Sequence, residues 1–177
     1  IDLTENPEFF QPQAITCFFK RSSIENVQFS KQVNLAEEIS FVNELLVDNP
    51  KIGICANCKI HSRNPSEKKT LLSLVPNYRE IQHDVKYTFM RLIEKSLDKY
   101  PTVPTFIQYT ILFYFNELIL NETINEKLNN KEIKHINDKI KEILEYIDND
   151  TIYSHGQIDA RIKAFLLYLK NDYSYPK

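Results

Sequence analysis

Apolar residues recur every three or four positions along most of the chain beyond residue 30, which is the spacing of amphipathic α-helices. A first helix is predicted from Asn34, which forms a capping-box pattern with Glu37, to Pro50, which cannot continue a helix. A brief helix is expected at 66–75. A long helix is then predicted from about residue 77 to residue 97, because apolar positions follow one face throughout this segment.

The next apolar segment, residues 103–120, is hydrophobic on nearly every side, as in a membrane span or a helix at the centre of a bundle. It contains Gln108, Asn116 and Glu117, and such polar side chains are costly inside a bilayer. The sequence therefore predicts a buried central helix and no membrane partner.

Two further helices are predicted in the C-terminal third of the chain. A capping-box pattern at Thr123–Glu126 is expected to start a short turn. A narrow apolar stripe follows, which consists of Ile133, Ile136, Ile140, Ile143 and Ile147. This stripe is expected to pack inside the bundle or against a second chain, so the oligomeric state stays open. A second box at Ser154–Gln157 is expected to begin the last helix, whose buried face consists of Ile158, Ile162, Phe165 and Leu169.

The order of these elements predicts an all-α fold. We expect a bundle of about four long helices plus shorter ones in residues 30–177, with residues 1–29 forming an irregular N-terminal arm or strap. A short helical solenoid is the alternative, because the long helices begin about every 25 residues. The chain has only two glycines, and folds built on hairpins or phosphate-binding loops need more of them.

The overall composition limits the expected partners and location. A formal charge of −2 gives no general attraction to nucleic acid or to anionic membranes. Three cysteines are an odd number for a disulfide scaffold, which predicts an intracellular protein, nuclear or cytoplasmic. Because its only methionine is internal, we expect the chain to be a processed product or a segment of a larger protein.

Cys55, Cys58 and His61 form the sharpest cluster of metal-ligating residue types. Two thiolates at this spacing can bind one zinc ion, and an imidazole nitrogen can join them. The second pair of ligands that a structural zinc site needs is missing, so the sequence predicts a loop without a cofactor and keeps zinc as an alternative. A redox role is less favoured still, because the thioredoxin-like βαβ context is absent.

The same segment is locally basic. Residues 51–69 carry a local charge of +4, with the basic side chains Lys51, Lys59, Arg63, Lys68 and Lys69. This loop is a candidate contact for nucleic-acid phosphates, although it holds no aromatic residue on which a base could stack.

No sequence pattern gives positive support for catalysis. The motifs of serine hydrolases, P-loop proteins, zinc proteases and dinucleotide-binding folds are all absent. Arg79 and His83 resemble the pair used by helical ribonucleases of the HEPN type, which would imply RNA cleavage. Those enzymes place four to six residues between the pair, whereas three intervene here. The chain is therefore not predicted to be an enzyme.

The N-terminal arm contains the sequence ITCFFKR, residues 15–21, which resembles the sliding-clamp-binding box known as the PCNA-interacting peptide. Ile15, Phe18 and Phe19 match its hydrophobic plug, and a short turn would bring the three to one side. The glutamine that anchors such boxes is out of register, since Pro12 occupies its position. This resemblance implies binding to another protein and a link to DNA replication or repair.

Two other interpretations of the arm stay open. The sequence IDLTE at residues 1–5 is similar to SUMO-interacting motifs, which add a strand to the edge of a partner's sheet. Alternatively, the arm is a strap, and its four phenylalanines pack onto the bundle; they are Phe9, Phe10, Phe18 and Phe19.

These observations predict three alternative functions. The first is a non-enzymatic helical domain for protein–protein contacts, a scaffold segment linked to DNA replication or repair. The second is a nucleic-acid-binding module that uses the basic loop, supported by zinc. The third is a helical ribonuclease.

Overall fold

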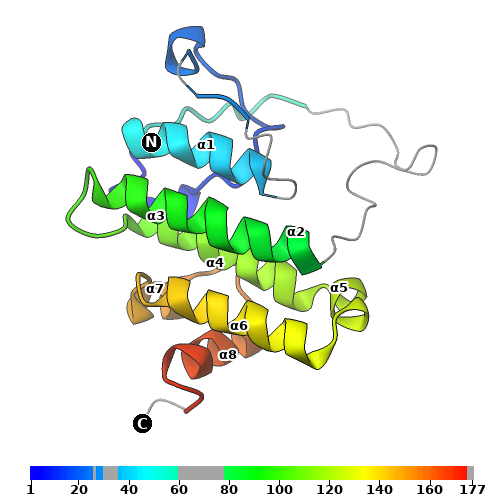
Figure 1. Cartoon of the computed structure of the whole chain (residues 1–177). Helices are drawn as coiled ribbons and strands as arrows, with labels where there is room; N and C mark the ends of the chain where they lie inside the picture. The colour runs from blue at the N-terminus through cyan, green and yellow to red at the C-terminus, as the bar shows by residue number, and fades with distance from the viewer. Residues whose placement is uncertain (26, 30–35, 60–77, 175–177) are drawn as a thin grey trace.

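A computed structural model describes residues 1–25, 27–29, 36–59 and 78–174, and these residues form an all-α bundle, as the sequence predicts (Figure 1). The longer helices are α1 (Glu37–Asp48), α3 (Met90–Leu97), α4 (Thr105–Leu120), α6 (Asn130–Leu144) and α8 (Ala160–Lys170). The shorter elements are α2 (Tyr78–His83), a π-helical segment η5 (Asp84–Phe89), α5 (Glu122–Lys127), α7 (Asn149–Ser154) and the 3₁₀ turns η1 (Pro7–Phe9) and η2 (Arg21–Ser23).

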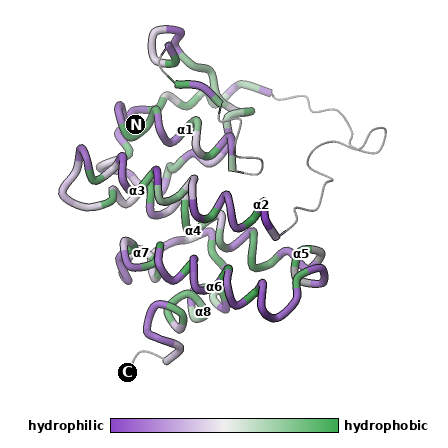
Figure 2. Tube along the Cα trace, viewed as in Figure 1, coloured by the Kyte–Doolittle hydropathy of each residue, from purple (hydrophilic) through white to green (hydrophobic). Residues whose placement is uncertain are grey.

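Helix α4 is the central element of the bundle, which confirms the interpretation of residues 103–120. It packs against α1, α5, α7 and η1. Figure 2 shows that its tube is mostly in the apolar colour, whereas the outer helices alternate between polar and apolar positions. Its core side chains include Phe106, Ile107, Ile111, Leu112 and Phe115, all fully buried. Among the helices that the structure describes, none has the length and apolarity needed to cross a membrane.

The predicted long helix is present at residues 78–97, but it is not a regular α-helix throughout. Helices α2 and α3 are joined without a break by the π-helical η5. The carboxylate of Asp84, the first residue of η5, accepts a hydrogen bond of 3.1 Å from the backbone N–H of Ala36. Ala36 is the N-cap residue of α1 and offers no capping side chain. The proposed cap, Asn34, and the brief helix at 66–75 lie outside the described residues.

Helix α6 follows the predicted isoleucine stripe. Ile136, Ile140 and Ile143 are buried, as is Ile147 just beyond the helix. These side chains face the interior because α6 packs against α2, η5 and α8. The helix begins with a capping box in which Asn129 and Glu132 bond to each other's backbone N–H groups. The short element before it, α5, starts at Glu122 with Asn121 as its N-cap, which is earlier than the box predicted at Thr123–Glu126. The stripe therefore packs within this chain.

The prediction that Ser154–Gln157 begins the last helix is wrong. Ser154 ends α7, a helix that the sequence pattern did not indicate, and α8 begins at Ala160 with Asp159 as its N-cap. The physical reason is a long-range contact. The side chain of Gln108 on α4 forms hydrogen bonds with both the N–H and the carboxylate of Asp148, the N-cap residue of α7, and this contact fixes a helix start before residue 154. A local pattern cannot show a contact across 40 residues.

The first ten residues belong to the same core as the helices. Leu3 is fully buried and Phe10 is nearly so. Backbone hydrogen bonds join Ile1 to Ile52 in both directions, at 2.8 and 3.0 Å, and an isolated antiparallel bridge pairs Asp2 with Lys51. The part of the arm up to Phe10 is thus packed as a strap.

Candidate protein-binding loop

Residues 11–19, which contain most of the clamp-box pattern, form a loop that is fixed at both ends. We refer to them as the 11–19 loop. Before it, the ring of Phe10 packs at 5.7 Å from Phe113 and at 5.2 Å from His155, measured between ring centroids. At its other end, Phe19 meets the ring of Phe41 on α1 edge-on at 5.3 Å. The loop therefore starts and finishes on the core.

Helix α1 also holds the backbone of the loop. One carboxylate oxygen of Glu38 accepts hydrogen bonds from the N–H groups of Ala14, at 2.8 Å, and Ile15, at 3.3 Å. The side-chain amide of the buried Asn43 donates to the carbonyl of Gln11 at 3.2 Å. Sequence reasoning missed both α1 residues, because nothing in their own spacing shows a partner more than 20 residues away.

The three predicted partner-binding residues differ in their surroundings. Ile15 is 66% exposed and Phe18 is 95% exposed, so neither contributes much to the core. Phe19 is half-buried against Phe41. Ile15 lies within a turn that is closed by a hydrogen bond from the N–H of Cys17 to the carbonyl of Ala14, and Phe18 follows this turn. The structure thus presents Ile15 and Phe18 to solvent, while Phe19 anchors the loop.

The SUMO-like segment at the N-terminus is packed differently. Its backbone is paired with residues 50–52, including a 2.8 Å hydrogen bond from Leu3 N–H to the carbonyl of Pro50. The side chain of Leu3 is fully buried. Binding by strand addition would therefore require these contacts to break, and the SUMO interpretation stays a prediction.

Cys55 and Cys58 lie in an exposed turn, and both are free thiols. Cys58 donates an S–H hydrogen bond to the sulfur of Cys55, with 2.6 Å between the two sulfur atoms. This bond, with a further one from the Asn57 backbone, lowers the pKa of Cys55, and donating it raises the pKa of Cys58.

The candidate zinc site is only partly described, because His61 lies outside the described residues. Two sulfurs that each lie about 2.3 Å from a tetrahedral zinc ion are about 3.8 Å apart. Cys55 and Cys58 would have to separate to reach that geometry, since their sulfurs are 2.6 Å apart. Within the described ranges there is no group of three or more metal-ligating side chains. The zinc site stays a prediction.

Two residues of the basic loop are described, Lys51 and Lys59, and both are exposed. The ammonium group of Lys51 lies 3.9 Å from the carboxylate of Asp2, which offsets part of its charge. Arg63, Lys68 and Lys69 lie outside the described residues. The nucleic-acid contact of this loop therefore stays a prediction.

The ribonuclease-like pair, Arg79 and His83, lies on α2. Arg79 is exposed on α2, whereas the ring of His83 packs at 4.5 Å from Tyr87. Nδ1 of His83 lies 3.9 Å from the buried carboxylate of Asp84, beyond hydrogen-bonding distance. No contact between Arg79 and His83 supports an RNA-cleaving site, and the ribonuclease hypothesis stays a prediction.

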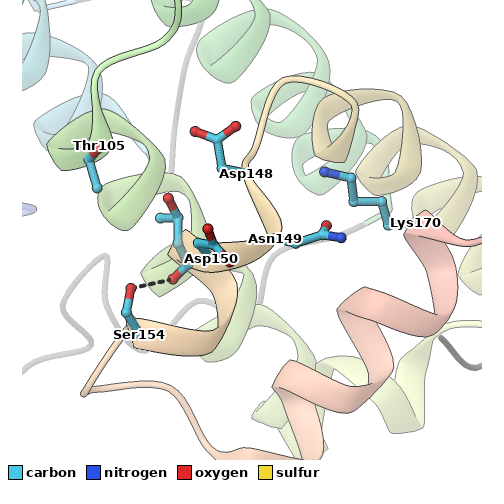
Figure 3. Close-up of a pocket in the computed structure, with 7 residues that line it drawn as sticks. Thr105, Asp148, Asn149, Asp150, Ser154 and Lys170 are labelled. Atoms are coloured by element: carbon cyan, nitrogen blue, oxygen red, sulfur yellow. Dashed lines mark hydrogen bonds between the residues drawn. The ribbon is translucent and has the colours of Figure 1, made fainter. Parts of the chain in front are cut away.

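A surface hollow of about 610 Å³ lies where α7 approaches the start of α4 and the end of α8 (Figure 3). Its polar groups serve the fold. Asp148 accepts a 2.8 Å hydrogen bond from Gln108, and the ammonium group of Lys170 donates to the carbonyl of Ile147. Ser154 bonds to the hydroxyl of Tyr109 at 2.9 Å. The hollow contains no histidine or cysteine, so it offers no thiol nucleophile and no imidazole base.

Comparison with known proteins gives one informative similarity. The chain is 21% identical, over 179 aligned positions, to the minor teichoic acid biosynthesis protein GgaB of Bacillus subtilis (strain 168). The alignment covers 100% of this chain and 20% of GgaB. This chain thus spans about a fifth of the curated relative that it matches. No protein-family model matches the chain, and no solved structure matches it with significance.

Proposed function

We propose that this chain is a non-enzymatic helical domain that makes protein–protein contacts, with Ile15 and Phe18 as its contact residues. The observation that carries the proposal is the 95% exposure of Phe18 on a loop whose two ends are packed into the core. Burying an aromatic ring against a partner removes about 150–250 Å² of surface from water, which gives such a residue a large share of a binding free energy.

The way in which the loop is held favours this role. A flexible segment loses conformational entropy when it binds, and a segment that is already ordered avoids most of that cost. The hydrogen bonds from Ala14 and Ile15 to Glu38 order the backbone of the 11–19 loop in the free protein. The exposed pair is therefore presented in a defined position.

The similarity to GgaB supports a setting for this domain. We infer that the chain is a segment of a larger protein that takes part in teichoic acid biosynthesis, since the alignment covers 100% of the chain but 20% of GgaB. In that setting the domain acts as a scaffold that holds a partner protein or another part of the same polypeptide. The link to DNA replication or repair rests on the clamp-box resemblance. In that box all three plug residues enter the partner. Here Phe19 is packed on Phe41, so Ile15 and Phe18 are the plug residues that face solvent.

Site-specific photocrosslinking in the full-length parent protein tests the contact. A photoreactive phenylalanine analogue at Phe18 is expected to give a discrete crosslinked product on irradiation of the producing cells. The matched control carries the same analogue at Tyr87, which is 52% exposed on η5 and far from the clamp-box sequence in the chain. Crosslinks that are equally abundant at both positions, or absent at both, would contradict the proposal.

Substitution then separates binding from folding. The double variant Ile15→Ala, Phe18→Ala is expected to bind the partner identified by crosslinking about tenfold or more weakly in a direct binding titration, because truncating a contact aromatic costs about 2 kcal/mol. Its free energy of unfolding should stay within about 0.5 kcal/mol of the parent value, since both side chains are exposed.

A further inference from the structure

We propose that Cys55 and Cys58 form a redox-active dithiol site that closes reversibly to an intramolecular disulfide by exchange with a low-molecular-weight disulfide. This site is separate from the 11–19 loop and does not depend on the function proposed above. It would make the turn at residues 55–58 sensitive to the thiol–disulfide balance of its surroundings.

The first argument is the distance between the two sulfur atoms. They are 2.6 Å apart, whereas a disulfide bond measures about 2.05 Å, so closure needs a shift of about half an ångström. The turn that contains Ala56 and Asn57 brings the two thiols together. A tetrahedral zinc site would instead require them to move apart by more than an ångström. The geometry therefore favours closure over metal binding.

The second argument is access. Cys55 and Cys58 are both exposed, and so are Gly53, Ile54 and Lys59 around them. A small disulfide can reach either sulfur without unfolding, and access is one of the factors that set the rate of exchange. Cys17, the remaining cysteine, is half-buried, and its thiol donates to the carbonyl of Gln13 at 3.2 Å. Burial also raises the pKa of Cys17, so Cys17 is the internal reference for a less reactive thiol in the same chain.

Either thiol can donate to the other, so the order of attack is part of the proposal. With Cys58 as the donor to the sulfur of Cys55, we assign Cys55 as the attacking sulfur. Cys58 is then the resolving cysteine.

The exchange proceeds in two balanced steps. The thiolate of Cys55 attacks one sulfur of the small disulfide, whose S–S bond breaks; one thiol leaves with the proton that Cys55 lost, and a mixed disulfide forms on Cys55. The thiolate of Cys58 then attacks the Cys55 sulfur and releases the second small thiol, which takes the proton of Cys58. The chain loses two hydrogen atoms and the small disulfide is reduced to two thiols.

Because the ring closes over only two intervening residues, its effect should be local. The loop-closure entropy removed from the unfolded chain is smallest for short loops. We therefore expect oxidation to leave the midpoint of thermal unfolding of the whole chain nearly unchanged. What changes is the shape of the turn, which leads from the strap contact at Lys51 towards residue 60.

The test is a redox titration of the whole 177-residue chain in glutathione buffers, followed by alkylation and mass spectrometry of the intact protein and its peptides. On oxidation we expect two of the three thiols to become resistant to alkylation together, with a mass loss of two hydrogens and no stable glutathione adduct. Cys17 should remain open to alkylation. The Cys17→Ser variant is the matched control and should titrate as the parent chain does.

Two single variants test the assigned order. Cys58→Ser cannot resolve the intermediate, so it should accumulate glutathione on Cys55. Cys55→Ser should react more slowly than Cys58→Ser, because the favoured attacking sulfur is gone. The proposal is overturned if the parent chain keeps a stable glutathione adduct, if Cys17 takes part in the disulfide, or if stoichiometric zinc binds and protects both thiols from oxidation.

Discussion

At the scale of single residues, His155 joins the N-terminal strap to the bundle. Its ring is buried, with its centroid 5.2 Å from that of Phe10 and 4.6 Å from that of Tyr109. Nδ1 accepts a hydrogen bond from the N–H of Gln157 at 3.2 Å. Nε2 must then carry the proton and donate to the carbonyl of Tyr109 at 3.0 Å. Both nitrogens are satisfied only in the neutral ring.

This arrangement predicts a loss of stability in mild acid. Burial lowers the pKa of His155 below its ordinary value. As the pH falls through about 6.5, the unfolded chain takes up a proton at this ring while the folded chain does not, so the free energy of unfolding decreases. The decrease ends once the pH passes below the pKa of the folded state.

Urea unfolding between pH 8 and pH 5 measures the effect. The variant His155→Gln should show a shallower pH dependence than the parent chain, because the residue responsible for this part of the slope is gone. The control is His135→Gln, since His135 is exposed and bonds to the hydroxyl of Tyr78 at 2.8 Å. An unchanged slope in His155→Gln, or an equal change in both variants, would refute the assignment.

At the scale of helices, two amides on α4 determine where later helices begin. The amide of Gln108 accepts the N–H of Asp148 and donates to its carboxylate, both at 2.8 Å. The carbonyl oxygen of Asn116 accepts the N–H of Asp159 at 3.1 Å. Asp148 and Asp159 are the N-cap residues of α7 and α8. The amides that favour a buried helix over a membrane span in the sequence therefore also organise the C-terminal helices.

Replacing either amide with an apolar side chain of similar size should weaken the bundle. Gln108→Leu and Asn116→Leu leave a backbone N–H without its partner, which costs about 1–3 kcal/mol each in the free energy of unfolding. Gln108→Leu should be the more harmful, because it also breaks the bond to the Asp148 carboxylate.

Chemical denaturation followed by circular dichroism checks this, with the opposite swap, Leu120→Gln, as the control. Leu120 is 42% exposed at the end of the same helix, so its exchange should change stability by about 0.5 kcal/mol or less. If both amide variants match this control, α4 does not determine where the later helices begin.

Long-range contacts such as those of Gln108 explain which parts of the fold can be predicted from the sequence and which cannot. Helices α1 and α6 and the continuous helix at 78–97 follow from their own apolar periods, and α4 follows from its nearly continuous apolar run. Their irregular features do not. The π-helical segment holds Asp84, which binds the start of α1, and the start of α7 depends on Gln108. Each involves a partner 40 or more residues away, which no local pattern contains.

The candidate loop was predictable to a similar degree. Adjacent aromatics near an aliphatic residue single out Ile15, Phe18 and Phe19 without coordinates. Which of them is free depends on tertiary packing, because Phe19 meets the ring of Phe41 on α1. Residue spacing therefore located the loop, and tertiary contacts decided which of its side chains face solvent.

At the scale of the whole molecule, the first ten residues of the chain pack back onto the helical bundle. The turn η1 packs on α4, and Leu3 and Phe10 are part of the same hydrophobic core as the helices (Figure 1). The strap therefore covers the central helix, whose apolar surface extends to nearly every side. Removing it would expose that surface and leave the 11–19 loop without its first anchor.

Adjacent phenylalanines allow this to be measured within one short segment. Phe10 is 7% exposed and touches α4, whereas Phe9 is 43% exposed. Phe10→Ala should lower the free energy of unfolding by about 3–5 kcal/mol, as for other buried phenylalanines, because it leaves a cavity against Tyr109, Phe113 and His155. Phe9→Ala removes a largely solvated ring and should cost less than about 1 kcal/mol.

Urea titration of the two variants, with limited proteolysis at the 11–19 loop, distinguishes a strap from a separable arm. In Phe10→Ala the loop should become sensitive to protease at urea concentrations that leave Phe9→Ala intact, since its first anchor is lost. Equal stabilities for the two variants would mean that the strap contributes little to the core. In that case residues 1–29 would behave as an independent arm, and the fixed presentation of Ile15 and Phe18 would depend on α1 alone, through Glu38 and Phe41.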